Sequence, residues 1–471
     1  MSGVWAASLD QVDPQDIWRK DRDHFLHPWT HFDSFKKDGS LVMARGEGAY
    51  VYDISGKRYL DGIGGLWCVN MGYGREEIIQ AMVDQARRLV YFSPFVDTTN
   101  VPAAELAAKL AALAPGALNH VFFTCGGSTA NDTAVRLTQY YQSRRGKKSK
   151  RHVIARTGGY HGSTYLTGSI SGKPGDRSPH LEFIQDWVHH VSAPNVYRRP
   201  KGMSVAAFCD HLVKELEDKI LEIGPENVSC FFAEPVLGAG GVMVPPEGYH
   251  RKTLEVCRRH DVLYISDEVV TGFGRLGHMF ASQEVFGIEP DIIVCAKGLT
   301  SGYQPLGACI FSDAIHEAIS AADPDGWFTN GYTYSGHPIA CAAGLANIAL
   351  MEREDICGHV RKVGPYLEAK LKELRDLPIV GDVRGHRFMM CVENVADRTT
   401  GELFPEDVDI GRRISRHCES LGLIVRPIGP LNVISPPLIL TKAQVDELAG
   451  LLRQGIEATM VDLRKEGLLR A

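Results

Sequence analysis

Lys297 occupies the most unusual position of any charged residue in this sequence. It follows the apolar run Ile-Ile-Val-Cys-Ala and precedes Gly298, so it stands at the end of a segment that predicts a buried strand. Burying an ammonium group without a partner is costly. A desolvated lysine has a lowered pKa and becomes a nucleophile that can attach a carbonyl compound. Considered alone, Lys297 is explained more simply as a lysine that reaches the surface past the strand end.

Asp267 changes that interpretation. It ends another apolar run, Val-Leu-Tyr-Ile-Ser, and about one strand–helix unit separates it from Lys297. In a parallel sheet the carboxyl ends of neighbouring strands meet at one crevice. Pyridoxal phosphate needs such a pair, an amine that attaches the cofactor and a carboxylate that keeps its pyridine nitrogen protonated. The alternative is that Asp267 only caps the following turn.

Two glycine-containing segments add further candidates. Gly126, Gly127 and Ser128 lie between an expected strand and an expected helix. Free backbone N–H groups at such a helix start favour an anion such as phosphate, although many strand–helix junctions contain glycine. Tyr160 and His161 follow another expected strand, and an aromatic ring there could stack on a flat cofactor. An ordinary core tyrosine is the alternative.

The elements that must position these residues alternate between strand and helix. We expect strands at residues 121–124, 152–156, 230–235, 262–266, 292–295 and 308–311. We expect helices at residues 103–113, 131–142, 208–223 and 249–260. Nearly all-apolar strands in this alternation predict an α/β fold with a mostly parallel sheet, covered by helices on both faces.

The two ends of the chain have a different pattern. Near the start, residues 48–61 predict a hairpin with Gly56 at its turn. Near the end we expect a helix at 362–374, strands at 387–392 and 423–427, and a last helix at 442–464. Both ends are therefore expected to build a smaller α+β domain beside a large one. The predicted divisions are 1–65, 66–345 and 346–471.

Composition excludes several classes of function. The 471 residues carry a formal net charge of -6, which gives no electrostatic sign of a nucleic-acid or anionic-membrane partner. The 11 cysteines are scattered without a Cys-x-x-Cys pair, which predicts free thiols in a reducing compartment and no metal site. No secretory signal and no membrane-spanning stretch is visible. We therefore expect a cytoplasmic protein.

Several ordered blocks of the sequence resemble the class III aminotransferases, which are fold-type I pyridoxal-phosphate enzymes. Within that family the resemblance is to the omega-transaminase or amine:pyruvate branch. It extends from about residue 46 to residue 440. The most specific blocks are LDGIGGLWCVNMGYGREE, GYHGSTYLTGS, FFAEPVLGAGGVMVPP, ISDEVVTGFGRLGHMF, AKGLTSGYQPLG and GYTYSGHPIACAAGLANI.

The resemblance implies a ping-pong transfer of an amino group from an amine or omega-amino donor to pyruvate or another 2-oxo acid. It implies pyridoxal 5'-phosphate as the cofactor, alternating with pyridoxamine phosphate. A different reaction of the same cofactor, such as that of an aminomutase, racemase or decarboxylase, remains open. A more distant alternative is an α/β protein that binds some other phosphate ligand.

The resemblance also assigns roles at the cofactor. Lys297 is similar to the lysine that carries the cofactor and moves the proton, and Asp267 to the aspartate that pairs with the pyridine nitrogen. The other expected cofactor contacts are Tyr160 and Val269 on the two faces of the ring, Gly127 and Ser128 at the phosphate, and His161 and Glu234 in their matching blocks. Thr333 is similar to a threonine that reaches the phosphate from the neighbouring subunit, which implies a homodimer with shared active sites.

Four residues are expected at the substrate. Trp67 and Phe95 are similar to aromatic residues that line the pocket. Arg426 resembles a mobile arginine that binds the substrate carboxylate through two parallel hydrogen bonds. At Ala239 the GABA and ornithine transaminases have a glutamate that neutralises this arginine, so alanine favours the amine:pyruvate branch.

Two positions depart from the family pattern. Thr129 replaces the usual glutamate after the phosphate loop, which leaves the side-chain support of that loop in question. Arg387 stands where a small glycine is usual.

Overall fold

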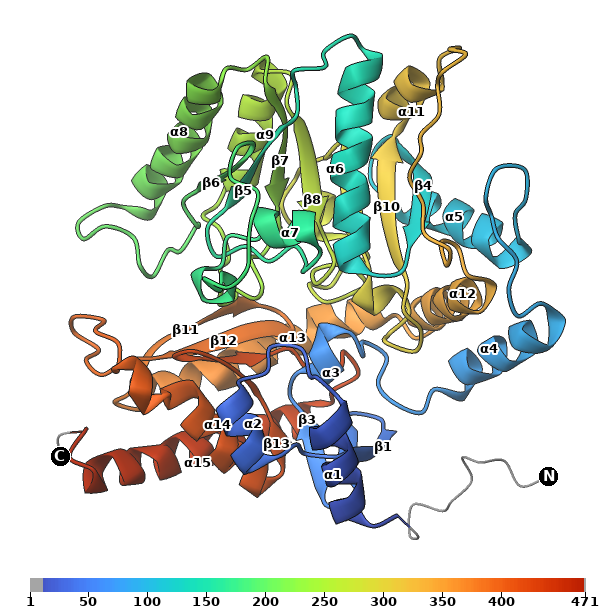
Figure 1. The fold of residues 1–471 in the computed structure, drawn as a ribbon. Coiled ribbons are helices and arrows are strands. Elements are labelled where there is room, and N and C mark those ends of the chain that lie inside the picture. Colours follow the sequence, from blue (N-terminus) through green and yellow to red (C-terminus); the bar gives the residue numbers. More distant parts are fainter. Residues whose placement is uncertain (1–11, 470–471) are drawn as a thin grey trace.

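A seven-stranded sheet forms the centre of the molecule in the computed structural model, which describes residues 12–469 (Figure 1). Only β10 runs antiparallel to its neighbours, so the mostly parallel α/β fold is confirmed. In spatial order the strands are β4 (Leu118–Thr124), β10 (Gly307–Ser312), β9 (Ile292–Cys295), β8 (Leu263–Asp267), β7 (Val228–Ala233), β5 (His152–Arg156) and β6 (Val188–Val191).

Helices cover both faces of this sheet because its strands are apolar on both sides. One face packs against α6 (Gly127–Arg144), α7 (Tyr165–Ile170) and α11 (Asp313–Ser320). The other face packs against α5 (Val101–Leu113), α8 (Val205–Ile223), α9 (Tyr249–Arg259) and α12 (Pro338–Arg353). Shorter or peripheral helices are α3 (Gly64–Trp67), α4 (Glu76–Arg88) and α10 (Ala281–Glu284).

The two ends of the chain come together beside the central sheet, in the lower half of Figure 1. One sheet contains β1 (Met43–Glu47), β2 (Tyr50–Asp53), β3 (Arg58–Asp61) and β13 (Leu423–Ile424), and β3 pairs in parallel with β13. The second sheet, called here the C-terminal sheet, contains β11 (Val380–His386), β12 (Met389–Asn394), β15 (Leu431–Ile434) and β14 (Arg426–Ile428). The helices here are α1 (Pro14–His24), α2 (Phe32–Asp38), α13 (Ile356–Lys372), α14 (Ile410–Leu421) and α15 (Lys442–Lys465).

Several predicted bounds need correction. The helix expected at 362–374 spans Ile356–Lys372, because the Asp355 side chain caps its start by accepting from the Gly358 N–H. The helix expected from residue 131 begins at Gly127, because Gly126 and Gly127 permit the tight entry into α6. The strand expected at 387–392 begins at Met389, because Arg387 has a positive φ of 53° in the β11–β12 turn. The strand expected at 423–427 is divided at Val425 between two sheets.

The Arg387 conformation explains why glycine is usual at that position. A positive φ is easy for glycine and strained for arginine. The Arg387 backbone N–H donates to Glu368 Oε1 at 2.8 Å, and its guanidinium donates to the same oxygen at 3.0 Å. Arg387 does not line the cavity described below, so this departure is not at the candidate site.

The proposed domain boundary at residues 345 and 346 falls inside α12. This helix packs against α4 and α5, and its buried residues share a hydrophobic core with β9 and β10 of the central sheet. We therefore move the proposed boundary to the turn at residues 354 and 355, and the division into domains stays a prediction. No helix in residues 12–469 is long and apolar enough to cross a bilayer.

Candidate active site

A cavity of about 610 Å³ lies at the carboxyl ends of the central strands. This is where ligands bind in open α/β sheets. The structure brings most of the sequence-predicted site residues together around it. These are Trp67, Gly127, Ser128, Tyr160, His161, Glu234, Ala239, Asp267, Val269, Lys297 and Arg426.

Lys297 enters the cavity from the end of β9, the strand that pairs in parallel with β8 and its terminal Asp267. Its backbone has a positive φ of 45°, an unfavourable conformation for a lysine. The Asn347 amide stabilises the turn by donating to the carbonyls of Gly298 at 2.9 Å and Leu299 at 3.0 Å. Burial lowers the pKa of the Lys297 amine, and the Asp267 charge partly opposes that shift. A neutral, nucleophilic amine is therefore favoured here.

Asp267 is buried and its carboxylate accepts three hydrogen bonds. Oδ2 accepts from Asn131 Nδ2 and from His161 Nδ1, each at 2.8 Å. Oδ1 accepts from the Val269 backbone N–H at 3.1 Å. The carboxylate can only accept, so His161 carries a proton on Nδ1. These three donors fix the orientation of the carboxylate.

The start of α6 forms a cradle for an anion. Gly126, Gly127 and Ser128 line the cavity, and the first N–H groups of the 18-residue α6 have no helical acceptors there. A Cβ at Gly127 would lie 3.0 Å from Val269 Cγ1, so the helix start fits closely against Val269. A Cβ at Gly126 would project into open space. Thr129 Oγ1 donates to the Gly126 carbonyl at 2.9 Å, so the threonine does support the loop.

These residues fit pyridoxal phosphate. The cradle at α6 suits its phosphate, Lys297 suits its aldehyde, and Asp267 suits its pyridine nitrogen. His161 lines the cavity, and its Nε2 atom is buried without a partner in the described part of the chain.

Glu234 supports the site through backbone contacts. Its Oε1 accepts from the Tyr160 N–H at 3.1 Å, and its Oε2 accepts from the Gly238 N–H at 2.7 Å. Burial raises the pKa of Glu234. Glu234 thereby connects the loop of Tyr160 to the turn that carries Ala239. Burial likewise raises the pKa of Tyr160, so its hydroxyl stays protonated.

One wall of the cavity is apolar, and the charged side chains of Arg426, Lys173 and Asp176 also line the cavity. Trp67 is buried and packs against Gly238, and Ala239 lies on the same wall. Arg426 begins β14 and is half-buried, and burial lowers the pKa of its guanidinium. Within residues 12–469 no ion pair involves this guanidinium. It is therefore available to a carboxylate ligand.

Phe95 and Thr333 lie outside the cavity of their own chain. Both are exposed, in two loops that contact each other. Tyr91 Oη donates to the Thr333 carbonyl at 2.6 Å, and a Cβ at Gly331 would lie 3.1 Å from the Phe95 ring. The sequence interpretation placed Thr333 on the neighbouring subunit, and an exposed position is compatible with that prediction.

Several residues that line the cavity were missed at the level of sequence, and four of them make side-chain hydrogen bonds there. Asn131 lies within α6, where an asparagine gives no signal of a role. Trp29 precedes the recognised blocks, and Lys173 and Asp176 follow the block that ends at Ser169. Trp29 Nε1 donates to Asp176 Oδ1 at 3.2 Å, and Lys173 Nζ pairs with the same oxygen at 2.7 Å. No local pattern indicates that these segments meet at the cavity.

Comparisons with known proteins agree with this geometry. The family model described as aminotransferase class-III matches residues 34–456. A putrescine–pyruvate aminotransferase from Pseudomonas aeruginosa is 42% identical over 93% of this chain and 95% of its own length. The omega transaminase from Pseudomonas jessenii, solved in complex with PMP, is 37% identical with a TM-score of 0.93, covering 95% of this chain and 99% of that one. An (S)-enantioselective omega-transaminase from Thermomicrobium roseum is 39% identical with a TM-score of 0.92, covering 96% and 99%.

Proposed function

We propose that this protein binds pyridoxal phosphate and uses a carboxylate-free amine as its donor. The chain belongs to the class-III aminotransferase family. The chain is an aminotransferase that moves an amino group from an amine to pyruvate or another 2-oxo acid. Enzymes of this family depend on pyridoxal phosphate. The observation that carries the proposal is the joint presence of Lys297, Asp267 and the α6 cradle around one cavity.

The residues of this chain divide the work of the reaction. When bound, pyridoxal phosphate supplies an aldehyde for the incoming amine and an electron-withdrawing ring. Lys297 Nζ would hold the cofactor and, once released, would take the proton from the substrate carbon and deliver it to the cofactor. Asp267 keeps a proton at the pyridine nitrogen, and the α6 N-terminus binds the phosphate. Arg426 binds the carboxylate of the 2-oxo acid in the second half of the ping-pong cycle.

The choice of donor rests on the substrate side of the cavity. Ala239 and Trp67 give an apolar wall. Of the two cations Arg426 and Lys173 that line the cavity, Lys173 pairs with Asp176 and Arg426 is the one available for an acid group. An apolar wall accepts a hydrocarbon substituent and offers a distal carboxylate no second partner. The name of the putrescine–pyruvate relative fits a donor without a carboxylate.

A panel of amine donors tests this function. With the cofactor-loaded enzyme and pyruvate, we expect alanine to form rapidly from (S)-1-phenylethylamine or putrescine and slowly from beta-alanine, taurine and GABA. Alanine formation, followed by coupled assay or chromatography, is the measurement. Turnover of the omega-amino acids alone would contradict the interpretation of Ala239. A loaded enzyme that makes no alanine from any donor would favour another acceptor or a racemase, aminomutase or decarboxylase reaction.

We further propose that the protein is a homodimer with shared active sites. Large apolar side chains are exposed near the cavity and on the two loops that carry Phe95 and Thr333. They include Leu66, Phe92, Val96, Trp327 and Tyr334. Such exposed apolar residues near one site support an interface with another subunit. A second copy would cover them and bring its own Thr333 toward the α6 cradle.

Subunit mixing tests this proposal. We expect Thr333→Ala to weaken cofactor binding by roughly ten- to a hundredfold, the effect of losing one hydrogen bond to a charged group. A dimer of one Thr333→Ala subunit and one Lys297→Ala subunit would contain one site in which both residues are intact. Activity at limiting cofactor should therefore recover when the two inactive or weakened proteins are unfolded and refolded together. If Thr333 serves its own chain, or if the protein is a monomer by light scattering, no recovery will occur.

A further inference from the structure

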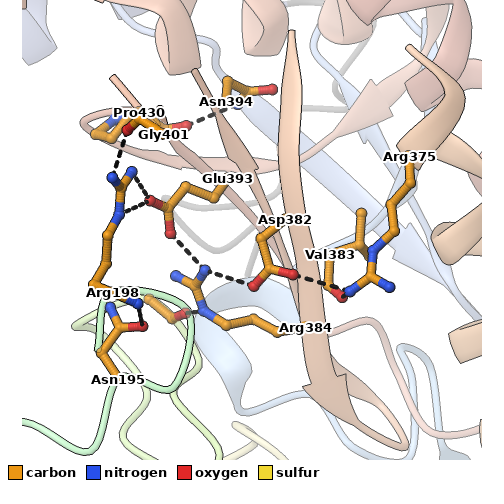
Figure 2. A network of polar contacts seen from close by, with 11 residues as sticks. Asn195, Arg198, Arg375, Asp382, Val383, Arg384, Glu393, Asn394, Gly401 and Pro430 are labelled. Atoms are coloured by element: carbon orange, nitrogen blue, oxygen red, sulfur yellow. Dashed lines mark hydrogen bonds and ion pairs between the residues drawn. The ribbon is translucent and has the colours of Figure 1, made fainter. Parts of the chain in front are cut away.

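A cluster of buried ion pairs lies between the C-terminal sheet and the loop at residues 195–201, away from the cavity (Figure 2). Arg384 on β11 pairs with Glu393 on β12 and with Asp382, whose Oδ2 lies 3.2 Å from Arg384 Nη1. Glu393 also pairs with Arg198, whose Nε donates to Glu393 Oε1 at 2.8 Å. None of these residues lines the substrate cavity.

Arg384 has a further contact that the rest of the cluster lacks. Its Nε donates to the Gly241 carbonyl at 2.7 Å. A Cβ at Gly241 would lie 2.9 Å from Arg384 Nη2 and 2.6 Å from Leu431 Cδ1, so the arginine and the β15 leucine both pack directly on this glycine. Gly241 has a φ of +117°, which a side chain would disfavour in any case.

Gly241 ends the turn that forms a wall of the cavity. Its N–H donates to the Gly238 carbonyl at 2.9 Å, and Ala239 lies between the two glycines. The opposite side of this turn is held by Glu234, which accepts from the Gly238 N–H, and by Trp67, which packs on Gly238. The turn is therefore held between the cavity residues on one side and the C-terminal sheet on the other.

The same sheet carries the cavity arginine. β14 begins with Arg426 and pairs with β15, where Arg426 lies opposite Val433. β15 pairs in turn with β12, where Leu431 lies opposite Glu393. The C-terminal sheet both carries Arg426 and packs on Gly241. This packing therefore sets the distance between Arg426 and the turn that contains Ala239.

The burial of the cluster favours a geometric role. The side chains of Arg384, Glu393 and Asp382 are 12%, 5% and 13% exposed. Replacing buried ion pairs by apolar residues is often neutral or stabilising, so stability alone is a weak reason for them. An arginine fork has directional donors that hold two partners in fixed positions.

We propose that Arg384 is a positioning residue for substrate selection, which rests on the aminotransferase function proposed above. Through its contacts with Gly241 and Glu393, it fixes the turn of Ala239 against the C-terminal sheet and so sets the width of the donor pocket. A bulky donor substituent must pack against this wall, whereas a small one does not reach it. Loss of Arg384 therefore changes the preference among donors more than it changes the chemistry.

The test is Arg384→Lys in the cofactor-loaded enzyme, since lysine keeps the positive charge and loses the fork that reaches Gly241 and Glu393 together. KM and kcat are measured for (S)-1-phenylethylamine and isopropylamine at saturating pyruvate. We expect kcat/KM for the bulky donor to fall about tenfold, mainly through KM, because a small misplacement of a binding wall weakens fit. Isopropylamine kinetics and the absorbance of the bound cofactor should stay near wild type.

The matched control is Arg375→Lys. Arg375 belongs to the same cluster, with its Nη2 2.9 Å from Asp382 Oδ1, but it has no contact with the turn and its side chain is 49% exposed. It should leave the donor ratio unchanged. If Arg384→Lys does not fold, Glu393→Gln should shift the same ratio in the same direction, because it removes the charge that orients Arg384.

The outcomes separate the two proposals. An equal loss for both donors, or an unchanged donor ratio in a variant with a lowered melting temperature, would show that Arg384 has only a structural role and would overturn the inference. A wild-type enzyme that transaminates neither of these donors nor putrescine would instead refute the proposed function.

Discussion

Replacement of Lys297 by alanine is expected to abolish steady-state transamination, with a loss of at least about 10⁴-fold. General acid–base catalysis by one positioned group is worth roughly 10²–10⁴-fold, and Lys297 also holds the cofactor covalently. The lowered pKa of its buried amine prepares it for both tasks. The measurement is alanine formation from pyruvate and a carboxylate-free amine, together with borohydride reduction and mass analysis of the peptide that contains residue 297.

Lys150 provides the matched control for this prediction. It is also a buried lysine whose pKa is lowered by burial, but it lies far from the cavity and donates to the carbonyls of Pro225 and His260 at 2.8 and 3.2 Å. The folded Lys150→Met variant should transaminate at the wild-type rate. After borohydride reduction its cofactor should still be found attached to residue 297. An alanine variant of Lys297 that turned over at the wild-type rate would refute its assignment.

Replacement of Asp267 by asparagine is expected to lower kcat by roughly 10²–10³-fold, comparable to the loss of one preorganised electrostatic group in an active site. The asparagine amide carries no negative charge, so it cannot keep a proton on the pyridine nitrogen by charge attraction. Its NH₂ group is itself a donor and would face the N–H donors of Asn131 and His161, which now bind the carboxylate. The protein should still bind cofactor, so the defect should be in turnover, measured as single-turnover rates with saturating amine.

Glu268 is the matched control for Asp267. It is the next residue in the chain and is equally buried, but its carboxylate accepts from Ala281 N–H at 2.7 Å and Ser282 N–H at 2.8 Å, away from the cavity. Glu268→Gln should lower thermal stability while the folded protein keeps its rate. Equal rate losses in both variants would mean that Asp267 affects the rate only by stabilising the folded structure.

The local sequence predicted the central sheet well because its strands are short and almost entirely apolar. Strands β5 and β9 have the predicted ends. The short β6, with His189 and His190 at its centre, was not predicted, because two histidines interrupt its apolar pattern. The C-terminal strand at 423–427 was predicted as one element, since nothing in Leu-Ile-Val-Arg-Pro marks the change of sheet at Val425.

The sequence by itself determined which residues could do the chemistry. A lysine and an aspartate at the ends of two apolar runs, and glycines before a helix, are local features, and strand order brings them to one edge of the sheet. Their burial, the hydrogen bonds that orient Asp267 and the positive φ of Lys297 arise only from packing between distant segments.

Only the tertiary structure decided which distant residues complete the walls of the substrate cavity. Trp29 reaches the cavity from one segment and Lys173 and Asp176 from another, and Arg384 contacts the turn of Ala239 from a strand of another sheet. Such contacts join residues that are far apart in sequence, and no periodicity or motif records which distant side chain will fill a given space. The physical reason is that close packing selects partners by shape and position in the folded chain.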